Sequence, residues 1–202
     1  MISIDITTNG AEITIPAGLE KLLSKENFRK FNEVGGRAAQ QAAKKYHKDF
    51  NQARKWRGPK YLGSGAGRAG EFGNEIENAW TFEGSDNDGA TIANDASFYR
   101  HKVYGGVIKP KRAKNLSIPV VADAVGRRAK DYKGDLFFLK TKKGTKGLFE
   151  KDGDDIRMVY LLKDKVDQDP WPGALPPTPA LAQAFGEKWS GEAIKELEKI
   201  LA

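Results

Sequence analysis

The sequence predicts an α+β protein, a mostly antiparallel β-sheet with two long helices packed on it, in a single domain over residues 1–202. Three observations predict this class. Apolar residues recur at helical spacing in two long segments, one in the N-terminal half and one at the C-terminus. Short apolar runs bounded by turn residues lie between these segments. The chain is also long enough to bury a core without disulfides, and it contains no cysteine.

The first predicted element is a β-hairpin over residues 1–17. Isoleucines alternate with polar residues over 2–6 and again over 13–15. Asn9-Gly10 lies between these runs, and this dipeptide is the strongest short hairpin signal because both residues tolerate positive φ. Pro16 ends the second strand.

A long amphipathic helix is predicted next, from Lys25 to about Arg54, with Ser24 as its N-terminal cap. Its apolar residues recur every three or four positions, and its opposite face is basic. Gly35-Gly36 lies inside this helix, where each glycine costs about 1 kcal/mol relative to alanine. We therefore expect another backbone to approach the helix closely at this point.

A glycine-rich loop follows over residues 57–74 and is expected to be a flexible arm that orders on a partner. Gly65–Gly70 matches the spacing of a dinucleotide-binding loop, but no strand precedes it, so we expect no nucleotide there. The candidate residues of a subunit-interface arm are Arg57, Gly63, Gly65, Gly67, Arg68 and Gly70.

Short apolar runs predict five further strands. These cover residues 76–83, 90–94, 116–121, 136–140 and 156–163. Residues 85–89, Gly144, Gly147 and residues 152–155 have the composition of turns. Five of the nine prolines lie in residues 169–179, which predicts an extended segment. A C-terminal helix follows from about Ala180 to Leu201.

The net charge of +7 is distributed in alternating blocks. Residues 1–60 carry +6, residues 61–99 carry −6, residues 100–146 carry +11 and residues 147–202 carry −4. Such blocks can attract one another within a chain or between copies, and the +11 block can also face a polyanion. Lys109, Lys111, Arg112 and Lys114 are the candidate DNA- or partner-facing residues of that block.

The sequence offers little that points to catalysis. The two histidines, His47 and His101, are far apart and are expected to be surface or partly buried polar residues. The acidic runs 86–89 and 152–155 lack the full spacing of a calcium loop and are expected to be turns. We therefore predict no enzyme activity, no catalytic residue, no metal site and no cofactor. No apolar stretch approaches the roughly 20 residues that span a bilayer, and we expect no membrane partner.

One segment carries a resemblance to a known family. An aromatic-rich stretch, Tyr99 to Tyr104, leads to Gly105-Gly106, and the pattern Ile-x-Pro-Lys-x-Ala-x-x-Leu-x-Ile-Pro follows over residues 108–119. This segment resembles the centre of the virion-morphogenesis, or tail-completion, family of tailed bacteriophages. The order of a basic helix, a glycine-rich loop, a late strand and a final helix is also similar. The proline-rich junction over residues 169–177 and the N-terminal hairpin depart from the family pattern.

The resemblance implies a structural protein of the head–tail junction, located in the virion tail or neck and assembled in the host cytoplasm. It implies a homo-oligomeric ring, hexameric or larger, that contacts head-completion and tail-tube proteins and can face packaged DNA. Trp171, held between two prolines, is a candidate anchor for a partner, because a constrained Trp loses little entropy on docking. Packing against the last helix is the other interpretation of Trp171. The alternative function is a nucleic-acid-binding protein that uses the basic segment 100–146.

Overall fold

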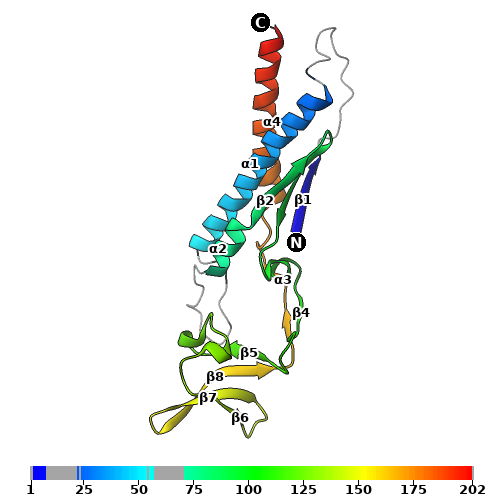
Figure 1. Ribbon diagram of the computed structural model, residues 1–202. Coiled ribbons are helices and arrows are strands. Elements are labelled where there is room, and N and C mark those ends of the chain that lie inside the picture. Colours follow the sequence, from blue (N-terminus) through cyan, green and yellow to red (C-terminus); the bar gives the residue numbers. More distant parts are fainter. Residues whose placement is uncertain (1, 8–21, 23, 54, 57–70, 202) are drawn as a thin grey trace. The chain divides into compact units, whose positions relative to one another are not determined.

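The computed structural model describes residues 2–7, 22, 24–53, 55–56 and 71–201, and it confirms the α+β class (Figure 1). The chain forms two compact units that are interleaved in sequence. Unit 1 comprises residues 1–53, 69–103 and 171–202, and unit 2 comprises residues 54–68 and 104–170. The assignment of the whole chain to a single domain stays a prediction.

Unit 1 combines long helices with a three-stranded antiparallel sheet. Its elements are β1 (Ile2–Thr7), α1 (Lys25–Gln52), α2 (Glu71–Asn78), β2 (Trp80–Ser85), β3 (Gly89–Asn94) and α4 (Thr178–Leu201). The strand order is β1-β3-β2, with Ile92 of β3 opposite Ile4 and Phe82. The helix α1 packs on β2, β3, α2 and α4. The main packing partner of α4 is therefore α1, whereas the sequence predicted that both helices pack on the sheet.

The predicted cap and the glycine pair of α1 both have a clear structural role. The Ser24 side chain accepts a hydrogen bond from the Asn27 backbone N–H at 3.2 Å. A Cβ added at Gly35 would lie 2.8 Å from the Phe185 ring of α4, and one at Gly36 would lie 2.5 Å from the Ala90 Cβ of β3. The two glycines therefore leave room for side chains on two sides of α1. The sequence predicted that another backbone approaches the helix here, but side chains make these close contacts.

Two predictions for unit 1 need correction. The predicted strand 76–83 is wrong over 76–78, because α2 ends at Asn78 and β2 begins at Trp80. The predicted loop 57–74 is wrong over 71–74, which lie in α2, and its residues 57–70 lie outside the described residues. Phe72 and Ile76 are four residues apart, and Ile76 is fully buried, so helical spacing explains this segment.

The predicted N-terminal hairpin is tested only in its first strand. Residues 2–7 form β1, which pairs antiparallel with β3. The second predicted strand, residues 13–15, lies outside the described residues. The proline-rich segment is also more folded than predicted. The Ala174 N–H donates to the Trp171 carbonyl at 3.0 Å, and Gly173 has a φ of +75°, which identifies a turn after Pro172.

Unit 2 contains two small antiparallel sheets. The strands β4 (Gly106–Ile108) and β9 (Val166–Gln168) form one, and the other has the order β5-β8-β7-β6. The second sheet consists of β5 (Leu116–Pro119), β6 (Phe137–Lys140), β7 (Lys146–Asp152) and β8 (Asp155–Lys163). Two short 3-10 helices, η2 (Ala122–Ala124) and η3 (Ala129–Asp131), connect β5 to β6. Ala124 packs with Val159 and Tyr160 in the core of this unit.

The strand β7 was not predicted, and the turn predicted at Gly147 is wrong. Gly147 lies inside β7 opposite Leu161, and a Cβ there would meet the Phe149 ring at 2.8 Å. An aromatic ring thus covers this glycine, and the sequence pattern of a turn is misleading here. The turns predicted at 152–155 and 85–89 are confirmed. The Asp86 carboxylate accepts hydrogen bonds from the Asp88 and Gly89 backbone N–H groups.

The helix α3 (Tyr99–Tyr104) forms in a segment for which the sequence pattern predicted no element. Tyr99, its first residue, is buried in unit 1. Among the described residues, no helix combines the length and the apolar character that crossing a membrane requires.

Candidate interaction surfaces

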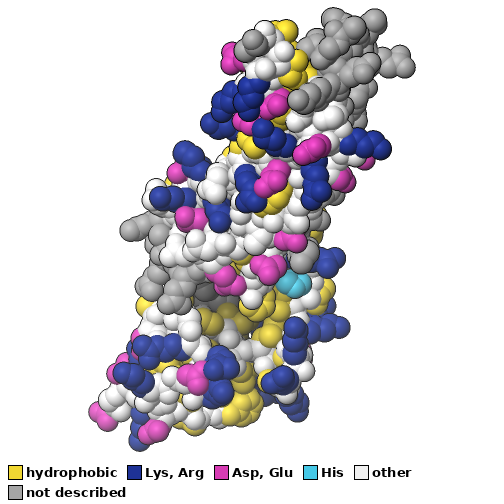
Figure 2. All heavy atoms as spheres, turned by 45° about the horizontal axis from the view of Figure 1, so that its top comes forward, with side chains coloured by type: hydrophobic (Ala, Val, Ile, Leu, Met, Phe, Trp, Pro, Cys, Tyr) yellow, Lys and Arg dark blue, Asp and Glu magenta, His cyan; other side chains and the backbone are white. Residues whose placement is uncertain are grey.

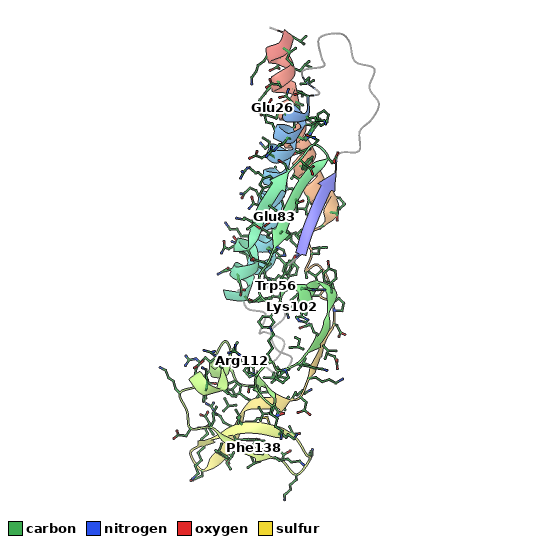
Figure 3. All side chains as sticks on the ribbon, turned by 45° about the vertical axis from the view of Figure 1, so that its right-hand side comes forward. Glu26, Trp56, Glu83, Lys102, Arg112 and Phe138 are labelled. Atoms are coloured by element: carbon green, nitrogen blue, oxygen red, sulfur yellow. The ribbon has the colours of Figure 1, made fainter. Side chains whose placement is uncertain are left out.

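The four basic residues predicted to face DNA or a partner lie together on one loop of unit 2. Lys109, Lys111, Arg112 and Lys114 all belong to the connection between β4 and β5, and all four are exposed. None of them forms an ion pair with a carboxylate within the described part of the chain. Figure 3 labels Arg112 on this loop. We call these residues the basic loop, a local concentration of positive charge that faces solvent.

Another cation of unit 2 is neutralised by its neighbours. Arg157 on β8 forms ion pairs with Glu150 on β7 and with Asp123 of η2, the latter at 2.9 Å. The Tyr132 hydroxyl lies 2.9 Å from both carboxylates. Partial burial and the two carboxylates raise the pKa of Tyr132 to about 12. Its hydroxyl and Arg157 in turn lower the pKa of Asp123. This network connects the 3-10 helices to the sheet, so its charged groups have a structural role within unit 2.

A segment of unit 1 and the greater part of unit 2 differ in the sign of their net charge. Residues 104–170, in unit 2, contain 16 Lys and Arg against 10 Asp and Glu. Many Lys and Arg side chains are visible on the surface in Figure 2. The acidic residues of unit 1 concentrate between the start of α2 and the residue after β3. This segment, residues 71–95, contains seven Asp and Glu and no Lys or Arg. Residues 71–95 of unit 1 and residues 104–170 of unit 2 therefore carry net charges of opposite sign.

A shallow hollow of about 390 Å³ lies in unit 2, at the start of β7 and the end of β8. Leu161 and Leu162 supply its apolar part. Lys146, Lys163 and Lys165 line it together with one carboxylate, Asp164, so the hollow is apolar in part and has a net positive charge. Sequence reasoning did not find this hollow, because its residues come from two strands whose register only the fold sets.

Trp171 is half-buried, and its contacts are with α3. Its indole ring lies 5.7 Å from the Lys102 ammonium, and its backbone N–H donates to the Lys102 carbonyl at 2.6 Å. The Phe72 ring of α2 lies at the same distance from that ammonium. Burial lowers the pKa of Lys102. The structure thus places Trp171 in a contact that joins α2, α3 and the proline-rich turn, and its role as a partner anchor stays a prediction.

The residues predicted for the subunit-interface arm, Arg57, Gly63, Gly65, Gly67, Arg68 and Gly70, lie outside the described residues. The same holds for the pattern Gly65–Gly70. Their assignment therefore stays a prediction.

His47 is the polar residue that sequence reasoning placed wrongly. It was expected at the surface or partly buried, but it is fully buried. The Trp80 indole N–H donates to its Nδ1 at 2.8 Å, so Nε2 carries the proton and donates to the Ala174 carbonyl at 2.9 Å. The Tyr99 hydroxyl donates to the same carbonyl at 3.0 Å. Burial lowers the pKa of His47, which keeps the ring neutral. This arrangement fixes the core of unit 1.

Comparisons of the chain with models of known protein families, with curated proteins and with solved structures found no match.

Proposed function

We propose that this chain is a structural protein of the head–tail junction of a tailed bacteriophage, where it forms a ring that completes the tail or connects it to the head. The proposal places it in the virion, next to head-completion and tail-tube proteins. It acts by fitting against copies of itself and against these neighbours, without transforming a substrate.

The observation that carries the proposal is the segment 99–119, which resembles the tail-completion family in sequence. In this chain the segment comprises α3, β4, the basic loop and β5. The four cations of the basic loop are exposed, and they have no carboxylate partner among the described residues. Exposed charge without an internal partner is suited to contact with another molecule.

Opposite charge on the two units also supports assembly from copies of one chain. A ring requires that each subunit present two different, complementary surfaces. Residues 71–95 are acidic throughout their charged positions, while residues 104–170 carry a net charge of +6. Such surfaces favour head-to-tail contact over contact between identical faces, because like charges repel.

The proposal is tested by the assembly state of the purified chain and by the composition of virions. We expect sedimentation velocity to detect concentration-dependent oligomers and negative-stain microscopy to image closed rings. We also expect mass spectrometry to identify the chain in purified particles. A strictly monomeric chain that is missing from particles would contradict the proposal.

Nucleic-acid binding is a second candidate function, and the exposed basic loop is the observation that favours it. Neutralising its cations as Lys109→Gln, Lys111→Gln, Arg112→Gln and Lys114→Gln should then weaken DNA binding by the free chain. The slope of log K against log salt should fall by about 0.9 for each phosphate that the variant no longer neutralises. A matched control neutralises exposed cations of unit 1, namely Lys25, Arg29, Lys48 and Lys188. Equal effects of the two variants would contradict specific use of the basic loop.

A further inference from the structure

Phe98 combines a strained backbone with an exposed aromatic side chain. Its φ is +63°, the only positive value among the non-glycine residues that the structure describes. Its side chain is 64% exposed. A bulky residue is disfavoured in the left-handed region, whereas Gly or Asn adopts this conformation more readily. Exposure means that burial within the chain does little to offset this cost.

The backbone conformation at Phe98 has a reason inside the fold, whereas nothing in the described part of the chain explains the choice of Phe. The Phe98 carbonyl accepts hydrogen bonds from the backbone N–H groups of His101 and Lys102, and so begins α3. This directs Tyr99 into the core, where it is 1% exposed. Any residue that tolerates positive φ can do the same. Strain kept together with an exposed aromatic ring points to contact with another molecule.

The surroundings of Phe98 are acidic. Asp95 is exposed three residues before it. The backbone N–H of Ser97, directly before Phe98, donates to the Glu75 carboxylate of α2 at 2.9 Å. Asp95 and Glu75 thus place two carboxylates near the exposed ring. A matching surface must offer an apolar contact for the ring and positive charge around it.

The hollow of unit 2 has both properties. Leu161 and Leu162 offer apolar contact, and its volume of about 390 Å³ gives room for one aromatic ring. Lys146, Lys163 and Lys165 outnumber the single carboxylate of its lining, Asp164, and give the border a net positive charge. The chain therefore carries an acid-bordered aromatic group on unit 1 and a lysine-bordered hollow on unit 2.

We propose that Phe98 of one copy docks in the hollow between β7 and β8 of a second copy of this chain. The contact joins two different surfaces, so it is heterologous, and repetition of such a contact closes a ring when the rotation between copies permits. Aromatic residues in pockets, surrounded by charged rims, are typical centres of binding energy at protein interfaces. This inference rests on the proposed function, because it requires that copies of the chain assemble.

The substitution Phe98→Asn tests the inference, because Asn tolerates positive φ and removes the aromatic ring. We expect it to raise the subunit dissociation constant, measured by sedimentation, at least tenfold. The urea midpoint of the monomer should stay the same or rise, because strain is relieved. The matched control is Phe138→Asn on β6, whose side chain is 60% exposed (Figure 3). This control should change the dissociation constant less than about threefold.

Charge reversal provides a second test that does not depend on Phe98. Asp95→Lys and Lys163→Glu should each weaken assembly, and the double variant should recover part of the loss, because each interface again pairs opposite charges. Lys48→Glu, at an exposed position of α1, is the control. If the natural chain assembles and Phe98→Asn assembles equally well, the docking site is wrong and the proposed function stands. If the natural chain never assembles, both fail.

Discussion

Unit 1 and unit 2 each contain a polar network, and the two networks differ in charge and in their contact with water. In unit 1 the network joins His47, Trp80, Tyr99 and the Ala174 carbonyl, and all three side chains are at most 1% exposed. Its groups are neutral. In unit 2 the network joins Arg157 to carboxylates, and the Arg157 side chain is 41% exposed.

The difference teaches that formal charge is a poor measure of how much a polar network contributes to the free energy of unfolding. Water stabilises the exposed charges of Arg157 and Asp123 nearly as well as the ion pair does, so the pair contributes little to the free energy of unfolding. A neutral indole N–H inside unit 1 has no access to water, so the loss of its acceptor costs the full desolvation of that group. Substitutions in the two networks should therefore differ in effect by several-fold.

The largest effect is expected from His47→Leu. The Trp80 indole N–H would remain buried without its acceptor, which is Nδ1 of His47. We expect a loss of about 3 kcal/mol in the free energy of unfolding, measured with urea. His101→Leu is the control, because His101 is only partly buried, and it should cost less than about 1 kcal/mol. Equal losses from the two variants would contradict a special role of the buried network.

A smaller loss is expected from Gly35→Ala, which tests the packing of α1 against α4. The new Cβ would lie 2.8 Å from the Phe185 ring, so a buried side chain must move. Overpacking should outweigh the gain in helix propensity and leave a net cost of about 1–2 kcal/mol. Gly191→Ala in α4 is the matched control, because its Cβ meets no atom within 4 Å. We expect it to stabilise the chain by up to about 1 kcal/mol in the same urea experiment. A gain from both variants would show that α1 and α4 are not in close contact at Gly35.

The next effect is a dependence of stability on pH near neutrality, and it arises from His47 in unit 1. Burial lowers the pKa of His47, so the unfolded chain binds a proton more readily than the folded one. Stability is therefore full above the unfolded pKa of about 6.5, and it falls as the pH drops from there through the folded pKa of His47. The slope can reach about 1.4 kcal/mol per pH unit. Urea midpoints between pH 8 and pH 5 measure it, and His47→Gln should remove this component. A slope that survives that substitution would assign it to another group.

The same comparison shows what a sequence can predict. The helical spacing of apolar residues between Phe31 and Phe50 predicted α1, and Ser24 marked its start. The predicted stripe ran through Ala38, Ala42 and Tyr46, which are only partly buried. The fully buried positions are Ala39, Ala43 and His47, each one residue later on the helix, so the predicted stripe did not include His47. Histidine was judged by its polarity, although a buried histidine is stable when both of its nitrogens have partners.

Other features depended on contacts that no local pattern encodes. Gly147 looked like a turn residue, and only the Phe149 ring that covers it explains why a strand needs glycine there. The helix α2 is eight residues long, and a segment of that length is compatible with more than one periodicity. The basic loop was found because a charge count suffices. The hollow and the strain at Phe98 required strand register and backbone angles.

The smallest effect is expected from Arg157→Gln, which removes the cation at the centre of the network in unit 2. Its side chain is 41% exposed, and water replaces much of what it contributes to Asp123, although Glu150 is buried and loses a partner. We expect a loss of about 1 kcal/mol or less in urea unfolding. The combined removal of Glu150 and Asp123 should lower the pKa of Tyr132, because burial and these carboxylates raise that pKa. Arg157→Gln should not lower it, because this change removes a positive charge that favours the phenolate. Absorbance of the phenolate between pH 9 and pH 13 reports the titration. A loss of stability as large as that of His47→Leu would contradict the comparison, because it would show that surface charges stabilise this protein as strongly as buried neutral hydrogen bonds do.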